Sequence, residues 1–178
     1  MGSGNNNNLT AAYIDRSSVI RVEGRGSFKV CPPMKQFIHQ VINTGSADRI
    51  LIEMSHCSGM DSTFMGVIAG IACSVKSNPE FAFKLINLSE KNMKLLVTLG
   101  VDRVVDYSRS ASEEEQALLN RLSNASETLE ADQSSTLETA RTTLEAHETL
   151  VDINPDNLSK FKSVLEYLSD DVRNLSED

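Results

Sequence analysis

A short polar segment between two apolar stretches carries the residues best suited to chemistry. Asp61 and Ser62 follow the apolar run 50–54 and a polar loop, and they directly precede the apolar, glycine-containing stretch 64–75. Aspartate and serine are common helix-capping residues, so the pair predicts that a helix begins here. A phosphate on a hydroxyl at this place would meet free backbone N–H groups and the positive end of the helix dipole. Ser62 is therefore a candidate for phosphorylation as well as for capping.

The sequence lacks the other common catalytic and metal-binding patterns. It has no G-x-x-x-x-G-K-[ST] phosphate loop, no G-x-S-x-G nucleophile motif and no H-E-x-x-H zinc motif. The cysteines form no C-x-x-C pair and the histidines lie far apart, so we expect no metal and no cofactor. No nucleophile and base can be paired from the sequence, which favours a binding protein over an enzyme. The residues concerned are Cys31, Cys57, Cys73, His39, His56 and His147.

The elements expected around Asp61 and Ser62 alternate between strand-like and helix-like periods. This alternation predicts an α/β fold, a mixed β-sheet packed with α-helices. The first helix should begin at Pro32–Pro33 and end at Gly45, because proline is favoured in the first turn of a helix and glycine just after its last turn. We expect strands at 9–14, 19–23, 49–54, 81–86 and 101–105, and further helices at 64–75 and 93–99.

Charge divides the chain near residue 110. The whole chain has a net charge of −8, but residues 1–110 hold 12 Lys/Arg and 9 Asp/Glu, whereas residues 111–178 hold 5 and 16. The division predicts a disordered segment at 1–8, an α/β domain at 9–109 and an acidic helical extension at 110–178. With no basic stripe, no apolar run near the roughly 20 residues of a membrane span and no signal-peptide pattern, we expect a cytoplasmic chain that neither binds nucleic acid nor inserts into a membrane.

The extension is expected to be helical throughout. Apolar residues recur at spacings of 3 and 4 over 118–129, 137–151 and 158–175, and Asn154–Pro155 is a typical helix start. This pattern predicts a C-terminal helical hairpin in which His147 is a packed seam residue. The polar stretch 132–136 either interrupts the first helix or is a flexible joint. The extension has several open roles: partner specificity, homodimer formation, or folding back over the binding face as an autoinhibitor.

Three segments of residues 9–109 resemble the STAS domain of bacterial anti-sigma factor antagonists. The family's Asp-Ser-Ser/Thr-Gly-Leu-Gly motif corresponds to residues 61–66, where Phe64 replaces the usual glycine. Its Asn-x-Ser motif and the following leucine-rich helix correspond to Asn87–Ser89 and 95–101. The family's Leu-x-Gly corresponds to Val22-x-Gly24. The resemblance implies the STAS-type mixed sheet with helices.

The resemblance also implies a function. In this family the unmodified protein binds an anti-sigma factor that is also a GHKL-type serine kinase, which frees a sigma factor and so regulates transcription. Phosphorylation of the serine reverses the binding, and a PPM-type phosphatase removes the phosphate. By position the acceptor is Ser62, with Thr63 as the alternative. The implied partner contacts are Gly24, Ser27, Met60, Asp61, Ser62, Thr63, Phe64, Met65, Gly66 and Asn87.

Several residues and roles keep a second interpretation. The pair Gly66 and Gly70 favours close packing of a helix on the sheet, although a small-residue face also lets a partner approach closely. Met60 and Met65 are candidates for adaptable contacts. The whole chain is alternatively a constitutive scaffold whose extension drives self-association, or an accessory STAS subunit of a lipid-transport ATPase.

Overall fold

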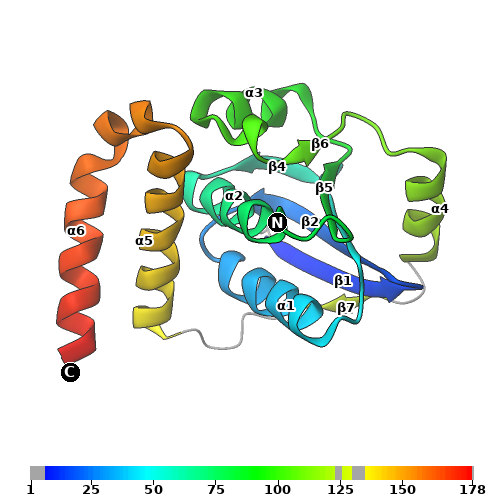
Figure 1. The fold of residues 1–178 in the computed structure, drawn as a ribbon, viewed down its shortest axis with the longest axis horizontal. Coiled ribbons are helices and arrows are strands. Elements are labelled where there is room, and N and C mark those ends of the chain that lie inside the picture. The colour runs from blue at the N-terminus through cyan, green and yellow to red at the C-terminus, as the bar shows by residue number, and fades with distance from the viewer. Residues whose placement is uncertain (1–6, 123–125, 130–134, 178) are drawn as a thin grey trace, which may run out of the picture.

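The computed structural model describes residues 7–122, 126–129 and 135–177. Strands and helices alternate up to α3, and helices dominate after residue 110 (Figure 1). The elements are β1 Asn8–Ile14, β2 Ser17–Gly26, α1 Cys31–Thr44, β3 Arg49–Glu53, β4 Cys57–Met60, α2 Ser62–Val75, β5 Ala82–Ile86, α3 Glu90–Leu99, β6 Asp106–Tyr107, α4 Glu113–Leu122, β7 Glu127–Thr128, α5 Thr136–Ile153 and α6 Leu158–Glu177, with short 3-10 helices at Val101–Arg103 and Pro155–Asn157.

The described strands form one mixed sheet in the order β6-β5-β3-β2-β1-β7. Strands β2, β3, β5 and β6 are parallel, whereas β1 pairs antiparallel with β2 and with β7. The end of β2 also pairs with β4, and the register shifts at Gly24/Arg25. Because β4 leads directly into α2, this pairing places the start of α2 beside the end of β2.

Helices cover both faces of the sheet. Alternate residues of a strand point to opposite faces, so Ile50 and Ile52 join one core and Leu51 joins the other. The larger core contains the buried sides of α1, α2 and α3 together with Ala146 and Leu150 of α5. The smaller one is closed by three leucines of α4, of which Leu122 is fully buried. Helix α4 thus belongs to the same packed unit as the sheet, although it lies beyond residue 110.

The last two helices form an antiparallel hairpin at one side of the molecule. Helix α5 lies between α2 and α6 (Figure 1). The hairpin turn is fixed by the buried Asn157, whose Nδ2 donates to the carbonyl oxygens of Leu99 at 2.9 Å and Leu150 at 2.8 Å. The free side of α6 is exposed and includes Val164 and Tyr167.

The expected fold class is confirmed: a mixed sheet packed with helices, followed by a helical hairpin. The helix after Pro32–Pro33, the helix after Asp61 and the hairpin turn at Asn154–Pro155 are where the sequence predicts them. None of the described helices is both long and apolar enough to cross a membrane.

The predicted strand at 101–105 is wrong. Gly100 ends α3 in the left-handed conformation at φ +76°, and the chain then continues into the 3-10 helix at 101–103. The N–H groups of Val104 and Val105 both donate to the carbonyl oxygen of Val101, which keeps this segment turned. The last parallel strand is therefore only β6, at 106–107.

Two further expectations differ from the structure. The segment 57–60, expected as part of a polar loop, is strand β4, and the buried Asn92 holds it by donating to the carbonyl oxygen of Cys57 at 3.0 Å. The helix expected through Leu129 ends at Leu122, and β7 then pairs with β1. Ala125 and residues 1–6 lie outside the described residues. Asn8, expected in a disordered segment, begins β1.

Candidate functional site

Asp61 fixes the start of α2 in three directions. Its backbone N–H donates to the carbonyl oxygen of Gly26 at 2.9 Å, which joins it to the end of β2. One carboxylate oxygen accepts from the N–H of Phe64 at 2.8 Å, the hydrogen bond of a helix N-cap. The other accepts from the N–H of Phe28 at 2.9 Å, in the loop before α1. Asp61 therefore positions Ser62, the first residue of the helix.

Ser62 is half-buried and contacts the C-terminal hairpin. Its Oγ lies 3.0 Å from Nε2 of His147 in α5. His147 is only 4% exposed, and its ring meets the edge of Phe161 of α6 with 4.8 Å between ring centroids. The expected seam histidine is thus packed, and its packing brings a ring nitrogen to the candidate phosphoacceptor.

The hydrogen bonds of His147 favour one of the two tautomers of its ring. Nδ1 lies 2.8 Å from the carbonyl oxygen of Thr143, which can only accept, so Nδ1 carries the proton. Nε2 is then an acceptor, and the Ser62 hydroxyl donates to it. A phosphate on Ser62 would replace this donor with oxygens that only accept, so the contact could persist only with a proton on Nε2.

The glycines of α2 face α5. A Cβ atom on Gly66 would lie 2.8 Å from the Cβ of Ala146 and closer still to the Ala146 carbonyl oxygen. A Cβ on Gly70 would lie 3.6 Å from Oγ1 of Thr149, an ordinary contact. The expectation that these glycines allow close packing on the sheet is wrong, because the close neighbour is a helix of the extension. The second interpretation holds in part: the glycine face of α2 accepts a close contact, but from α5 of the same chain.

Several predicted partner contacts are buried in this structure. Phe64 is fully buried and fills the space that a side chain on Gly26 would need. Met60 and Met65 are each 4% exposed, so they pack in the core and do not serve as surface contacts here. The bulk of Phe64 therefore points into the protein and does not narrow access to Ser62.

The remaining predicted contacts are spread over the structure. Thr63 and Ser27 are buried, and the Ser27 hydroxyl has no hydrogen-bond partner among the described residues. Gly24, at φ +78°, donates its N–H to the carbonyl oxygen of His56 at 3.1 Å, and its own carbonyl oxygen accepts from the hydroxyl of Ser58 at 3.0 Å. Asn87, at φ +58°, accepts from the N–H of Ala111 at 2.8 Å. Of the two candidate acceptors, Ser62 is the more accessible.

Asn87 also belongs to a buried network around Glu53. The Glu53 carboxylate is 1% exposed and accepts from Arg21 Nε at 2.9 Å, from the N–H of Ser55 at 2.8 Å and from Asn87 Nδ2 at 3.3 Å. Burial alone would raise the pKa of Glu53, but the hydrogen bonds from Ser55, Asn87 and Arg21 outweigh burial and hold the pKa below its usual value. This network gives the family-like asparagine a role inside the fold.

Other potentially reactive groups give no second site. Burial, and next the nearby Asp61 carboxylate, raise the pKa of the Cys31 thiol above its usual value, which makes it a poor nucleophile. Within the described parts of the chain, no three His, Cys, Asp or Glu side chains gather as a metal site would need. Nδ1 of His56 lies 2.9 Å from the hydroxyl of its exposed neighbour Ser55.

The partners that the extension brings to α2 could not be predicted from the sequence. His147 and Ala146 are 85 and 80 residues from Ser62 and Gly66, and no local pattern pairs them. One usable signal was present: two glycines four residues apart on a helix, together with an unassigned helical hairpin, are consistent with close helix-to-helix contact.

Comparison with solved structures identifies the fold. No family model matches the chain, and no curated protein matches it in sequence. TM1081 of Thermotoga maritima, assigned as an anti-sigma factor antagonist, superposes with a TM-score of 0.52 at 22% identity, over 61% of this chain and 86% of that one.

Two further structures agree with this assignment of the fold. The anti-sigma factor antagonist SpoIIAA, a Bacillus cell fate determinant, matches in its unphosphorylated form with a TM-score of 0.50 at 21% identity, over 64% of this chain and 97% of that one. A variant of RsbS from Moorella thermoacetica matches with a TM-score of 0.51 at 16% identity, over 64% and 96%. The chain therefore has the STAS-type fold of the anti-sigma factor antagonists.

Proposed function

We propose that this chain is a cytoplasmic anti-sigma factor antagonist that works by partner switching. The unmodified protein binds an anti-sigma factor of the GHKL kinase type and so releases a sigma factor. Phosphorylation of Ser62 ends the binding, and a PPM-type phosphatase restores it. The protein acts by binding, and the catalytic groups, ATP and magnesium belong to the kinase. The observation that carries this proposal is a half-buried serine at the first residue of α2, capped by Asp61, in a chain with this fold.

The position of Ser62 suits a switch that acts on a partner. A phosphate adds about −1.5 to −2 charges at neutral pH. At the first turn of α2 it would meet backbone N–H groups and the positive end of the helix dipole, so the domain should tolerate it. A partner surface that buries the unmodified serine would have to bury an unpaired dianion. Such burial costs several kcal/mol, so partner affinity should fall by about a hundredfold or more.

The direct test is phosphoryl transfer. We would incubate the full chain with ATP, magnesium and the GHKL-type kinase encoded beside it, and follow the intact mass. The expected result is the gain of one phosphate that maps to Ser62. Ser62→Ala should abolish the gain, and Thr63→Ala should retain it, because Thr63 is buried. A kinase that is active on another substrate but leaves this chain unmodified would contradict the proposal.

A constitutive binding module is the second candidate. It is favoured by the hydrogen bond that ties Ser62 to His147 and by the exposed Val164 and Tyr167 on the free side of α6. In this case the hairpin forms a homodimer or docks to a larger complex, and phosphorylation has no role. Light scattering during size-exclusion chromatography separates the two. A dimer that Val164→Ser/Tyr167→Ser converts to a monomer supports the module, whereas a monomeric wild type removes self-association.

A further inference from the structure

Helix α5 covers the face of α2 that begins at the candidate phosphoacceptor. The contact starts at Ser62 with His147, continues at Gly66 with Ala146 and reaches Gly70 with Thr149. These positions are four residues apart on α2, so they form one stripe along the helix. The stripe is occupied over two turns by α5, a segment about 80 residues further along the chain.

The stripe is shaped for a helix. At Gly66 the backbone of α5 approaches so closely that no side chain fits between the two helices. Small residues let helix backbones come together in this way and so increase packing contacts. The stripe carries one hydroxyl and no charged residue. A helix that occupies it therefore needs a small residue at the crossing point and a hydrogen-bonding group opposite Ser62.

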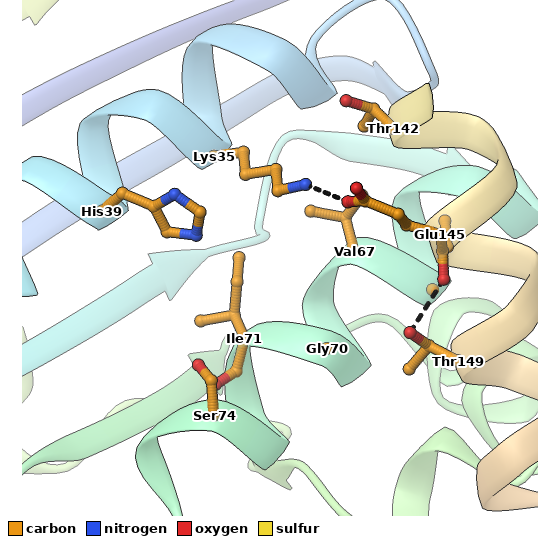
Figure 2. Close-up of a pocket in the computed structure, with 11 residues that line it drawn as sticks. Lys35, His39, Val67, Gly70, Ile71, Ser74, Thr142, Glu145 and Thr149 are labelled. Carbon is orange, nitrogen blue, oxygen red and sulfur yellow. Dashed lines mark hydrogen bonds and ion pairs between the residues drawn. The ribbon is translucent and has the colours of Figure 1, made fainter. Parts of the chain in front are cut away.

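The α5 contact is tight along this stripe and loose beside it. A cavity of about 190 Å³ remains where α1, α2 and α5 meet, next to Gly70 and Ile71 (Figure 2). Across the cavity, Lys35 of α1 reaches Glu145 of α5 in an ion pair whose two side chains are 28% and 59% exposed (Figure 2). Exposed ion pairs contribute little to stability. At this edge the ion pair therefore adds little, and the hairpin is held by its turn at Asn157 and by Ala146 and Leu150 of α5, which are buried in the larger core.

From this geometry we infer that α5 competes in cis with the partner for the Ser62–Gly70 stripe of α2. The inference rests on the proposed function, since the partner is the kinase that must reach Ser62. In the closed state, in which α5 covers α2, the hydrogen bond between Ser62 and His147 helps to hold the hairpin over the serine. The partner binds when the hairpin leaves, and it replaces α5 with a helix of its own.

A reversible disulfide lock tests the competition in the full chain. Gly70→Cys/Thr149→Cys places two thiols across the contact, where the existing distance from a Cβ on residue 70 to Oγ1 of Thr149 is 3.6 Å. Cys73, which is exposed, is replaced by serine to prevent mispairing. The oxidised chain should bind the kinase at least about tenfold more weakly than the same chain after reduction, and it should take up phosphate correspondingly more slowly.

A second variant removes the hydrogen bond between Ser62 and His147 without changing any residue of α2. His147→Ala removes the acceptor of the Ser62 hydroxyl, and a lost hydrogen bond of this kind changes an equilibrium by about tenfold. Kinase affinity should rise by about that factor. Glu148→Ala is the matched control, because Glu148 is exposed on the next position of the same helix and should leave the affinity unchanged.

The outcomes separate the two proposals. Weaker binding by the locked chain, or tighter binding by His147→Ala with an unchanged Glu148→Ala, supports competition. Equal affinities for the locked, reduced, His147→Ala and wild-type chains overturn the competition and leave the proposed function standing. A kinase that binds none of these chains, reduced or oxidised, contradicts the proposed function and with it the competition.

Discussion

At the scale of single residues, the central contact joins Ser62 of α2 to His147 of α5. The serine is placed by its neighbour Asp61, and the histidine by the carbonyl oxygen of Thr143. Each of the two side chains is therefore oriented by a contact within its own helix or helix cap. A hydroxyl in this arrangement can be exchanged between an internal acceptor and an external partner without changing the helix that carries it.

The cap at Asp61 gives the first prediction. Asp61→Ala removes the acceptor for the N–H groups of Phe64 and Phe28, so the free energy of unfolding should fall by about 1–2 kcal/mol. Asp61→Asn keeps one carbonyl oxygen at the cap and should cost less than Asp61→Ala. Urea denaturation followed by circular dichroism measures both. Equal stability of the alanine variant and the wild type would contradict the capping role.

Glu53 gives a prediction that depends on pH. Its carboxyl pKa is held below the usual value near 4.5 in the folded state, so its contribution to stability is complete above that value and is lost as the pH falls through the lower, folded-state pKa. Glu53→Gln leaves Arg21 without its buried carboxylate, and the free energy of unfolding at pH 7 should fall by about 3 kcal/mol.

The acid range distinguishes this effect from a simple packing defect. Between neutral pH and about pH 3 the wild type should lose more stability than Glu53→Gln, because the variant has no carboxylate to protonate at this position. Chemical denaturation at several pH values measures the difference. Parallel stability curves for the two proteins would show that the carboxylate is not linked to folding as described.

At the scale of elements, the contact between α2 and α5 predicts opposite effects for two similar substitutions. Gly66→Ala places a methyl group against the Ala146 backbone, so it should destabilise the full chain by about 1–3 kcal/mol. Gly70→Ala meets only Thr149 at ordinary contact distance, and alanine favours helix over glycine, so stability should stay the same or rise by up to about 1 kcal/mol. Thermal unfolding compares them. A loss of stability in both variants to the same extent would mean that the close approach at Gly66 has no special role.

Local signals explain which elements could be predicted from the sequence. The start of α2 was predictable because a cap depends on neighbours in the chain, and Asp61 bonds to Phe64 three residues away. The turn at Asn154–Pro155 was predictable for the same reason. Segments whose structure depends on distant partners were not. Strand β4 exists because it pairs with β2 and is held by Asn92, and its short polar sequence has no strand period.

The candidate site shows the same division. Ser62 and Asp61 were identified from local sequence and family resemblance, whereas burial of Phe64 follows from its packing against Gly26 of β2. The contact of Ser62 with His147 joins residues 85 positions apart. Periodicity identifies the buried side of a helix but does not name the helix that covers it, so this contact required the structure.

At the scale of the whole molecule, the charge boundary near residue 110 does not coincide with the edge of the packed core. Leu122 of α4 is fully buried with Leu51 and Ile86 of the sheet, and Glu115 forms an ion pair with Lys84 at 2.8 Å. Leu122→Ala should therefore lower the free energy of unfolding by about 2–5 kcal/mol. Leu158→Ala is the control: Leu158 is 50% exposed, and its loss should cost less than about 1 kcal/mol. A tolerated Leu122→Ala would place α4 outside the core.

This packing determines how the extension can be studied. Removal of everything after residue 110 would remove α4 and expose Val19, Leu51 and Ile86. The effects of losing this core could then not be separated from the effects of losing the hairpin. Point substitutions on α5, such as His147→Ala, leave α4 and the sheet intact. They isolate the part of the extension that lies over the face of α2.

The central claim is that a phosphate on Ser62 decides whether the chain binds its kinase partner. The most direct measurement is the dissociation constant of that kinase for the unmodified chain and for the chain phosphorylated at Ser62, in one buffer. Phosphorylation is expected to weaken binding by about a hundredfold or more. Equal dissociation constants for the two forms would contradict it.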